Sequence, residues 1–275
     1  MSLNLSAGAP VIFLTNNYCS PDLISAGSKV TASAMEAIAD RVVDMDPYSY
    51  WQGASADDGV TETLDIPLYV GTTQTLRSDI AVLALLNTNL ASFNIKLSDD
   101  NGVSFHTTYA ITGNTGANYI KDISDGIKSA NLIRIEAVGT IVPNSLKKIG
   151  TVVAAGLLLQ MTTVPDSPIN RSDIENVKVL TMGDGSQNIT YMKRSAASFE
   201  FYNASFQFSL MTAAEVETMR TLRRDNPAFI IYPEPGEFPG EMFYARFNGG
   251  FKIAPSSEYK GAGYDLRFTV TEIGS

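Results

Sequence analysis

Short runs of alternating polar and apolar residues recur through the first part of the chain. Residues 61–66 and 93–97 alternate as half-buried strands do, and the continuous apolar run 80–86 between them suits a strand buried on both faces. Further runs follow, separated by Gly, Asn and Asp turns, at 105–111, 132–138 and 152–161. This spacing predicts an all-β domain over residues 29–162, with a short helix possible at 34–39.

The last third of the chain has a different pattern, in which one helix interrupts the strands. Residues 197–202 and 204–210 alternate aromatic and polar side chains and predict two strands. Thr212 and Glu215 have the spacing of a capping box, which predicts a helix from there to about residue 225. More strands are predicted at 229–232, 241–247 and 264–273. Together these elements predict a smaller β-rich domain with one helix.

Two segments lie outside these domains. The segment 163–168 contains Pro165 and Pro168, which predict a linker because proline interrupts helices and strands. The second domain is therefore expected to span 169–275. Residues 1–28 are rich in Ser, Asn and Gly around one apolar run, and they predict an N-terminal arm or a first strand.

Composition and charge exclude several classes of partner. The chain has 275 residues and a formal net charge of -9, and its basic residues are scattered. This argues against nucleic acid and anionic membranes as partners. The longest apolar run, 151–161, is too short to cross a bilayer, and no basic segment typical of a signal peptide precedes the apolar run at 9–14. The single cysteine, Cys19, cannot form an internal disulfide, so we expect synthesis in a reducing cytoplasm.

The residues needed for catalysis are not grouped in the sequence. His106 is the only histidine, no Gly-x-Ser-x-Gly motif is present, and Cys19 lies in a polar turn before a proline. One Cys and one His cannot make the usual structural zinc site. The Gly-rich segment 182–186 lacks the Lys of a phosphate loop and is predicted to be a hairpin turn. The prediction is therefore a chain that is not an enzyme and has no cofactor or metal.

Two groups of residues suggest ligand binding, each with a structural alternative. Four carboxylates could offer hard oxygen ligands to calcium, although solvated turn positions are the favoured interpretation. They are Asp44, Asp46, Asp57 and Asp58. Trp51, with Tyr48 and Tyr50, could stack on a sugar ring, although a core position is the favoured interpretation for Trp51.

The order of features in the first domain resembles a known β-sandwich. An acidic turn precedes Trp51; an alternating strand, an apolar strand, the Asn-Thr-Asn turn 87–89, a second alternating strand and the Asp-Asp-Asn-Gly turn 99–102 follow. This order is similar to the galactose-binding-like jelly roll of discoidin and F5/8 type C modules, over roughly residues 29–161. The resemblance implies a fold with many uses, in which a structural ion is often held near the acidic turn.

The order of features in the second domain is similar to domains of tailed-phage tail and baseplate proteins, including distal tail proteins. It consists of the aromatic strands, the capped helix, Phe-Ile-Ile-Tyr-Pro at 229–233, Tyr-Ala-Arg at 244–246 and a final aromatic strand. In distal tail proteins the sandwich usually follows this domain, whereas here it comes first. The resemblance implies a mainly β chain with a jelly-roll sandwich followed by a smaller α+β domain.

The two resemblances imply two functions of different class. The first is a structural protein of a phage tail or baseplate, located in the virion, that assembles with other tail proteins and with copies of itself. Arg220, Arg223 and Arg224, near the end of the predicted helix, are the candidate interface because they could meet an acidic neighbour. The alternative is a carbohydrate-binding module for attachment to a host glycan, with loops at one end of the sandwich as the site.

Overall fold

The computed structural model divides the chain into two units, and each is described by itself. The first unit comprises Met1–Gln160, Phe229–Met242 and Ser275, and the second comprises Met161–Ala228 and Phe243–Gly274. The described residues are 12–15, 17–20, 29–44, 49–69, 76–77, 79–123, 128–161, 170–174, 177–181, 187–191, 201–225, 229–232, 243–255 and 263–272.

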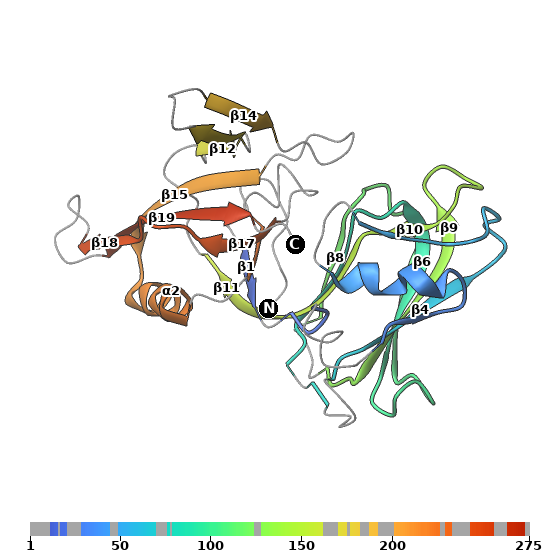
Figure 1. Ribbon diagram of the computed structural model, residues 1–275. Coiled ribbons are helices and arrows are strands. Elements are labelled where there is room, and N and C mark those ends of the chain that lie inside the picture. Colours follow the sequence, from blue (N-terminus) through green and yellow to red (C-terminus); the bar gives the residue numbers. More distant parts are fainter. Residues whose placement is uncertain are drawn as a thin grey trace. The chain divides into compact units, whose positions relative to one another are not determined.

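The first unit contains a five-stranded antiparallel sheet, drawn mostly in blue and green in Figure 1. Its spatial order is β2 (Thr31–Ala32), β4 (Glu62–Pro67), β9 (Leu132–Thr140), β6 (Leu90–Ser98) and β7 (Thr107–Ile111). Residues on β4 alternate between buried and partly exposed, as the sequence pattern predicts. This sheet therefore has one face turned to the core and one turned to solvent.

A second set of antiparallel strands lies on the other side of the same core. Its order is β16 (Phe229–Tyr232), β1 (Ile12–Thr15), β11 (Thr151–Gln160), β5 (Val82–Leu86) and β8 (Tyr119–Asp122). Leu83 and Leu85 of β5 belong to one buried cluster with Phe93 and Ile95 of β6. One core enclosed by two sheets makes this unit a β-sandwich, as predicted.

A short pair of strands and one helix close the side of the sandwich. β3 (Trp51–Gln52) pairs with β10 (Lys148–Ile149), and the 3-10 helix η1 spans Glu36–Val43. The helix begins later than the predicted 34–39 because Met35 has a φ of 53°, which is not helical. Ala39, Val42 and Val43 are buried, so η1 places its apolar side on the core.

The second unit is a smaller sheet with one α-helix. The sheet order is β12 (Asn170–Ile174), β15 (Phe201–Met211), β19 (Tyr264–Glu272) and β17 (Phe243–Phe247), and β18 (Lys252–Pro255) also pairs with β19. β13 (Val177–Thr181) and β14 (Gln187–Tyr191) form a separate antiparallel pair. The predicted hairpin turn at 182–186 lies outside the described residues.

Aromatic side chains and the helix form the core of the second unit. Phe206, Phe208 and Phe268 stack with ring centroids 5.1 to 6.3 Å apart. The helix α2 (Ala213–Asp225) buries Val216, Met219 and Leu222. The Thr212 hydroxyl accepts a hydrogen bond from the Glu215 amide, and the Glu215 carboxylate accepts one from the Thr212 amide. These two bonds confirm the predicted capping box.

Two predictions about the second domain differ from the structure. The predicted strands 197–202 and 204–210 are one strand over the described part, because Asn203 keeps the ladder register opposite Thr271 and no turn interrupts it. The irregularity comes later, at Leu210, whose φ is 59°. β16 pairs with β1 and so belongs to the first unit rather than to the predicted domain 169–275. The predicted linker 163–168 lies outside the described residues.

None of the helices in the described part of the chain is long and apolar enough to span a bilayer.

Candidate functional site

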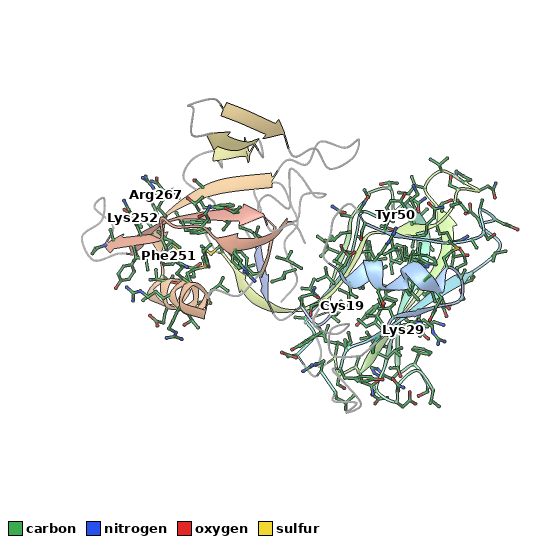
Figure 2. All side chains as sticks on the ribbon, viewed as in Figure 1. Cys19, Lys29, Tyr50, Phe251, Lys252 and Arg267 are labelled. Atoms are coloured by element: carbon green, nitrogen blue, oxygen red, sulfur yellow. The ribbon has the colours of Figure 1, made fainter. Side chains whose placement is uncertain are left out.

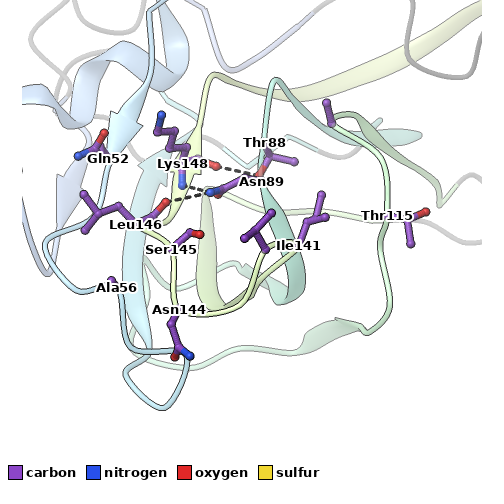
Figure 3. A pocket seen from close by; sticks show the side chains of 12 residues that line it. Gln52, Ala56, Thr88, Asn89, Thr115, Ile141, Asn144, Ser145, Leu146 and Lys148 are labelled. Carbon is purple, nitrogen blue, oxygen red and sulfur yellow. Dashed lines mark hydrogen bonds between the residues drawn. The ribbon is translucent and has the colours of Figure 1, made fainter.

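A hollow of about 810 Å³ opens among the loops at one end of the sandwich (Figure 3). β4 and β6 start at this end and the antiparallel β9 finishes there, so the loops before and after them gather at one edge. The loops are 53–61, 87–89, 112–118 and 141–147. The hollow is lined by Gln52, Ala56, Thr88, Asn89, Thr115, Ala117, Ile141, Val142, Asn144, Ser145, Leu146 and Lys148. We call it the loop-end hollow.

The turn 87–89 is fixed to strand β10 by side-chain hydrogen bonds, drawn as dashed lines in Figure 3. The Asn89 side chain accepts from the Lys148 amide at 2.7 Å and donates to the Leu146 carbonyl at 2.9 Å. The Thr88 hydroxyl donates to the Lys148 carbonyl at 2.8 Å. Because these side chains are satisfied within the protein, they shape the floor of the hollow rather than reach out of it.

The loop 112–118 is held by Asn114 in a similar way. Its side-chain amide donates to the Leu90 carbonyl at 2.7 Å and to the Gly116 carbonyl at 2.9 Å. Its backbone amide donates to the Ala91 carbonyl at 2.9 Å. These bonds fix the path of the loop that presents Thr115 to the hollow.

Asp58 joins the loops 53–61 and 141–147. One carboxylate oxygen accepts from the Thr140 amide and hydroxyl at 3.1 and 3.0 Å, and the other accepts from the Asn144 amide at 3.1 Å. The Asn144 amide, followed by the bonds from Thr140, holds the pKa of the Asp58 carboxyl below its usual range. A charged Asp58 at neutral pH therefore keeps one wall of the hollow in place.

Several polar side chains of the hollow are unpaired within the described ranges. Gln52, Thr115, Asn144 and Ser145 make no side-chain hydrogen bond with the described part of the chain. Beside them, Val142 is 68% exposed and Ile141 is 37% exposed. The hollow therefore offers amide and hydroxyl groups next to exposed apolar surface, on loops whose backbone is held by other hydrogen bonds. Such a surface suits a ligand that has both polar and apolar edges.

Trp51 and Tyr50, which the sequence offered as candidate sugar contacts, do not line the hollow. Trp51 is completely buried, and its indole N–H donates to the Ala34 carbonyl at 3.0 Å, so it is a core residue and not a glycan contact. Tyr50 is half-buried (Figure 2), and the Lys148 ammonium lies over its ring at 4.8 Å from the centroid. Tyr48 lies outside the described residues.

Asp44, Asp57 and Asp58, considered for calcium, accept hydrogen bonds from the protein. Asp44 accepts from the Ser49 hydroxyl at 2.5 Å, and Asp57 accepts from the Gly59 amide at 2.7 Å. Asp58 is used as described above, and Asp46 lies outside the described residues. Within the ranges that the structure covers, no three His, Cys, Asp or Glu side chains are grouped to hold a metal ion.

The structure places His106 at the surface and Cys19 in the core. His106 is exposed, and its Nδ1 lies 2.9 Å from the Thr107 hydroxyl in the turn before β7. Cys19 is completely buried (Figure 2), and burial raises the pKa of its thiol to about 12. Such a thiol stays protonated at neutral pH.

The three arginines of the candidate interface lie on the C-terminal half of α2. Arg220 pairs with Glu217 at 3.3 Å, and Arg223 lies over the ring of Phe247 at 5.9 Å. Arg220 and Arg224 are exposed. The exposed ion pair is worth little energetically, so Arg220 could exchange it for another partner.

The residues that line the loop-end hollow carried no recognisable motif in the sequence. They come from strands β3 and β10 and from separate loops, and the tertiary fold alone brings Gln52, Thr115 and Asn144 to one place. The one local signal was the Asn-Thr-Asn turn 87–89, which the sequence indicated as a turn and which forms the floor of the hollow.

A scan against protein-family models found no match, and a search of curated proteins found none either. Solved structures are similar to about half of the chain. Chitosan-binding module 1 of a chitosanase/glucanase from Paenibacillus sp. IK-5 is 18% identical, with 52% of this chain and 100% of that chain covered and a TM-score of 0.41.

Two other similar structures are also carbohydrate-binding modules. A Streptococcus pneumoniae fucose-binding module is 14% identical, with 51% of this chain and 94% of that chain covered and a TM-score of 0.38. The family 32 carbohydrate-binding module of C. perfringens NanJ, solved with galactose, is 13% identical, with coverages of 53% and 98% and a TM-score of 0.38. Similarity at this level does not transfer a ligand to this chain.

Proposed function

We propose that the chain is a non-catalytic carbohydrate-binding protein and that the loop-end hollow is its site. The observation that carries this proposal is that the polar side chains in and beside the hollow have two different roles. Asn89 and Asp58 hold the backbone, while the side chains of Gln52, Thr115 and Asn144 make no hydrogen bond to the residues that the structure describes.

The chemistry of the hollow matches that of a small sugar. Amide and hydroxyl groups can donate to and accept from sugar hydroxyls, because each offers both functions within a small volume. Val142 and Ile141 offer apolar surface to the C–H side of a sugar ring. A volume of about 810 Å³ lies within the usual range for small-ligand sites, so it could hold a short oligosaccharide.

A glycan array probed with the full chain tests the proposal, followed by calorimetric titration of the best glycan. Gln52→Ala should weaken binding by about fivefold, because a lost hydrogen bond costs about 1 kcal/mol. Asn144→Gly should weaken it similarly, and glycine keeps the backbone at this residue, whose φ is 56°. His106→Ala is the matched control, because His106 lies in the turn after the opposite end of β6.

Two results would overturn the proposal. One is the absence of binding to any glycan on a broad array by correctly folded protein. The other is binding that Gln52→Ala and Asn144→Gly leave unchanged, because the glycan would then sit elsewhere on the chain.

Assembly into a phage tail or baseplate stays a prediction, as do a location in the virion and contacts with tail proteins. Its test is the association state of the full chain by native mass measurement. Charge reversal at Arg223 and Arg224 should then weaken assembly more than folding. A chain that neither self-associates nor binds tail proteins would contradict this role and leave the glycan proposal intact.

A further inference from the structure

Lys147 is a buried lysine whose surroundings are unusual. Its side chain is completely buried, and its Nζ donates to the carbonyl oxygens of Asp57 at 2.9 Å and Ser55 at 3.5 Å. It forms no close ion pair within the described ranges, and its charge acts on the Asp58 carboxyl only as the last of the causes that lower the pKa of that carboxyl. A lysine is seldom fully buried without a carboxylate, because the loss of hydration is costly. Here backbone carbonyl oxygens replace the water.

The same loop is held at its start by Glu62, whose side chain is 4% exposed. One carboxylate oxygen accepts from the Ala54 amide at 2.7 Å and from the Ser55 amide at 3.2 Å. The Gly53 amide donates to the Lys147 carbonyl at 2.9 Å, which ties the loop to Lys147 a second time. The Glu62 carboxylate thus binds two N–H groups of the loop, and the Lys147 ammonium binds two of its carbonyl oxygens.

Carbonyl oxygens that converge on one positive centre are the surroundings that proteins also give to bound cations. The ammonium group supplies that positive centre here and is covalently attached to the chain. The acidic residues of this loop, which suggested calcium ligands in the sequence, are used otherwise: Asp58 accepts from Thr140 and Asn144, and Asp57 accepts from Gly59.

We propose that the Lys147 ammonium is a built-in cation that holds the loop 53–61 through the carbonyl oxygens of Asp57 and Ser55, which we call the carbonyl cage. Removal of the ammonium converts this pair of oxygens into a binding site for a small external cation. The loop supplies Ala56 to the loop-end hollow. The wall of the hollow is consequently independent of free metal ions. The proposal holds whether or not the hollow takes a glycan.

Thermal unfolding of the full chain is the first test. Neither calcium chloride nor EDTA should change the melting temperature of the wild-type protein. Lys147→Met removes the charge and keeps most of the side-chain volume. It should lower the melting temperature by about 4 °C or more, because buried carbonyls lose their donor. Lys29→Met is the control, since Lys29 is exposed and its ion pair with Glu36 lies at the surface.

Chemical rescue separates a cation site from a simple loss of packing. Lys147→Ala should regain most of its lost melting temperature with ethylammonium chloride. Tetrabutylammonium chloride at the same concentration should have no such effect, because it is too large for the cage. Equal effects of the two salts, or stability of Lys147→Met equal to that of the Lys29→Met control, would overturn the proposal.

A measurement on the wild-type protein covers the case in which neither variant folds. The Lys147 ammonium should give a nitrogen resonance whose protons exchange with water at least about tenfold more slowly than those of exposed Lys29, because burial limits exchange. Exchange as fast as that of Lys29, or a wild-type melting temperature that calcium raises, would contradict the built-in cation.

Discussion

At the scale of single residues, the hydrogen bonds that the fold provides to a side chain determine its chemical properties. Asp100, in the turn between β6 and β7, accepts from the Ser104 hydroxyl at 2.6 Å and the Ser104 amide at 2.8 Å. The Ser98 hydroxyl donates to it at 2.7 Å. These bonds favour the charged form, with those from Ser104 contributing most, and they lower the pKa of Asp100 to about 2.

The first prediction concerns the titration of Asp100. Because its folded pKa lies below the ordinary value of 3.8, its contribution to stability is present above about pH 4 and is lost as the pH falls toward 2. A titration of the carboxyl carbon by NMR should show a midpoint near 2. Ser104→Ala should move the midpoint up toward 3.8, while Ser49→Ala should leave it in place. An unperturbed midpoint in the wild-type protein would contradict the turn geometry.

The second prediction concerns Trp51, which is completely buried and bonded to the Ala34 carbonyl. Trp51→Ala should lower the free energy of unfolding by ~3–5 kcal/mol, as other truncations of large buried aromatics do. Tyr50→Ala, at a half-buried neighbour, should cost much less. Denaturant unfolding measures both. If Trp51→Ala kept full stability and lost only glycan binding, Trp51 would be a ligand contact and not a core residue.

At the scale of elements, the ends of helices and strands are decided by local side-chain chemistry. The capping box starts α2 at the residue the sequence indicates. η1 starts at Glu36 instead of residue 34, because Met35 has a left-handed backbone and the Glu36 carboxylate accepts from the Ala32 amide at 2.6 Å. A helix start with a side-chain cap is therefore readable from sequence, and one set by an unusual backbone angle is not.

The third prediction concerns the cap of α2. Thr212→Ala removes the hydroxyl that accepts from the Glu215 amide, and it should lower the free energy of unfolding by about 1 kcal/mol. Thr218→Ala is the control on the same helix. The Thr218 hydroxyl bonds to the Ala214 carbonyl one turn back, so alanine there should be neutral or slightly stabilising. Equal decreases in the free energy of unfolding of the two variants would show that the cap does not stabilise the helix more than Thr218 does.

At the scale of the whole molecule, each unit is built from segments that are not continuous in sequence. The segment Phe229–Met242 lies between stretches of the second unit in sequence but belongs to the first. Its strand β16 pairs with β1, through partners such as Phe13 and Ile231. Burial of Phe13 and Phe229, with ring centroids 5.8 Å apart, supports this pairing.

The fourth prediction follows from this interleaving. Limited proteolysis should cut first at 163–168 or near the N-terminus, because linkers with small and polar residues and chain termini are preferred cleavage sites. The two products of a single cut at 163–168 should still elute together from a sizing column, because β16 remains paired with β1. Separation of the products without denaturant would contradict the interleaved arrangement, and first cleavage within β15 would contradict the boundary.

The sequence by itself determined the longer strands of the sandwich, such as β4, β6 and β9, and where α2 begins, because alternation, apolar runs and the capping box act over a few neighbouring residues. It also indicated the mainly β class and the sandwich, which the two sheets around one core confirm. It did not indicate the short strands β3 and β10 or the strands β12 to β14. Only the tertiary structure decided which strand pairs with β1, that Trp51 is inside, and that Lys147 is enclosed by carbonyl oxygens. Gln52, Thr115 and Asn144 meet only where strand ends converge, since pairing between strands far apart in sequence determines which loops become neighbours.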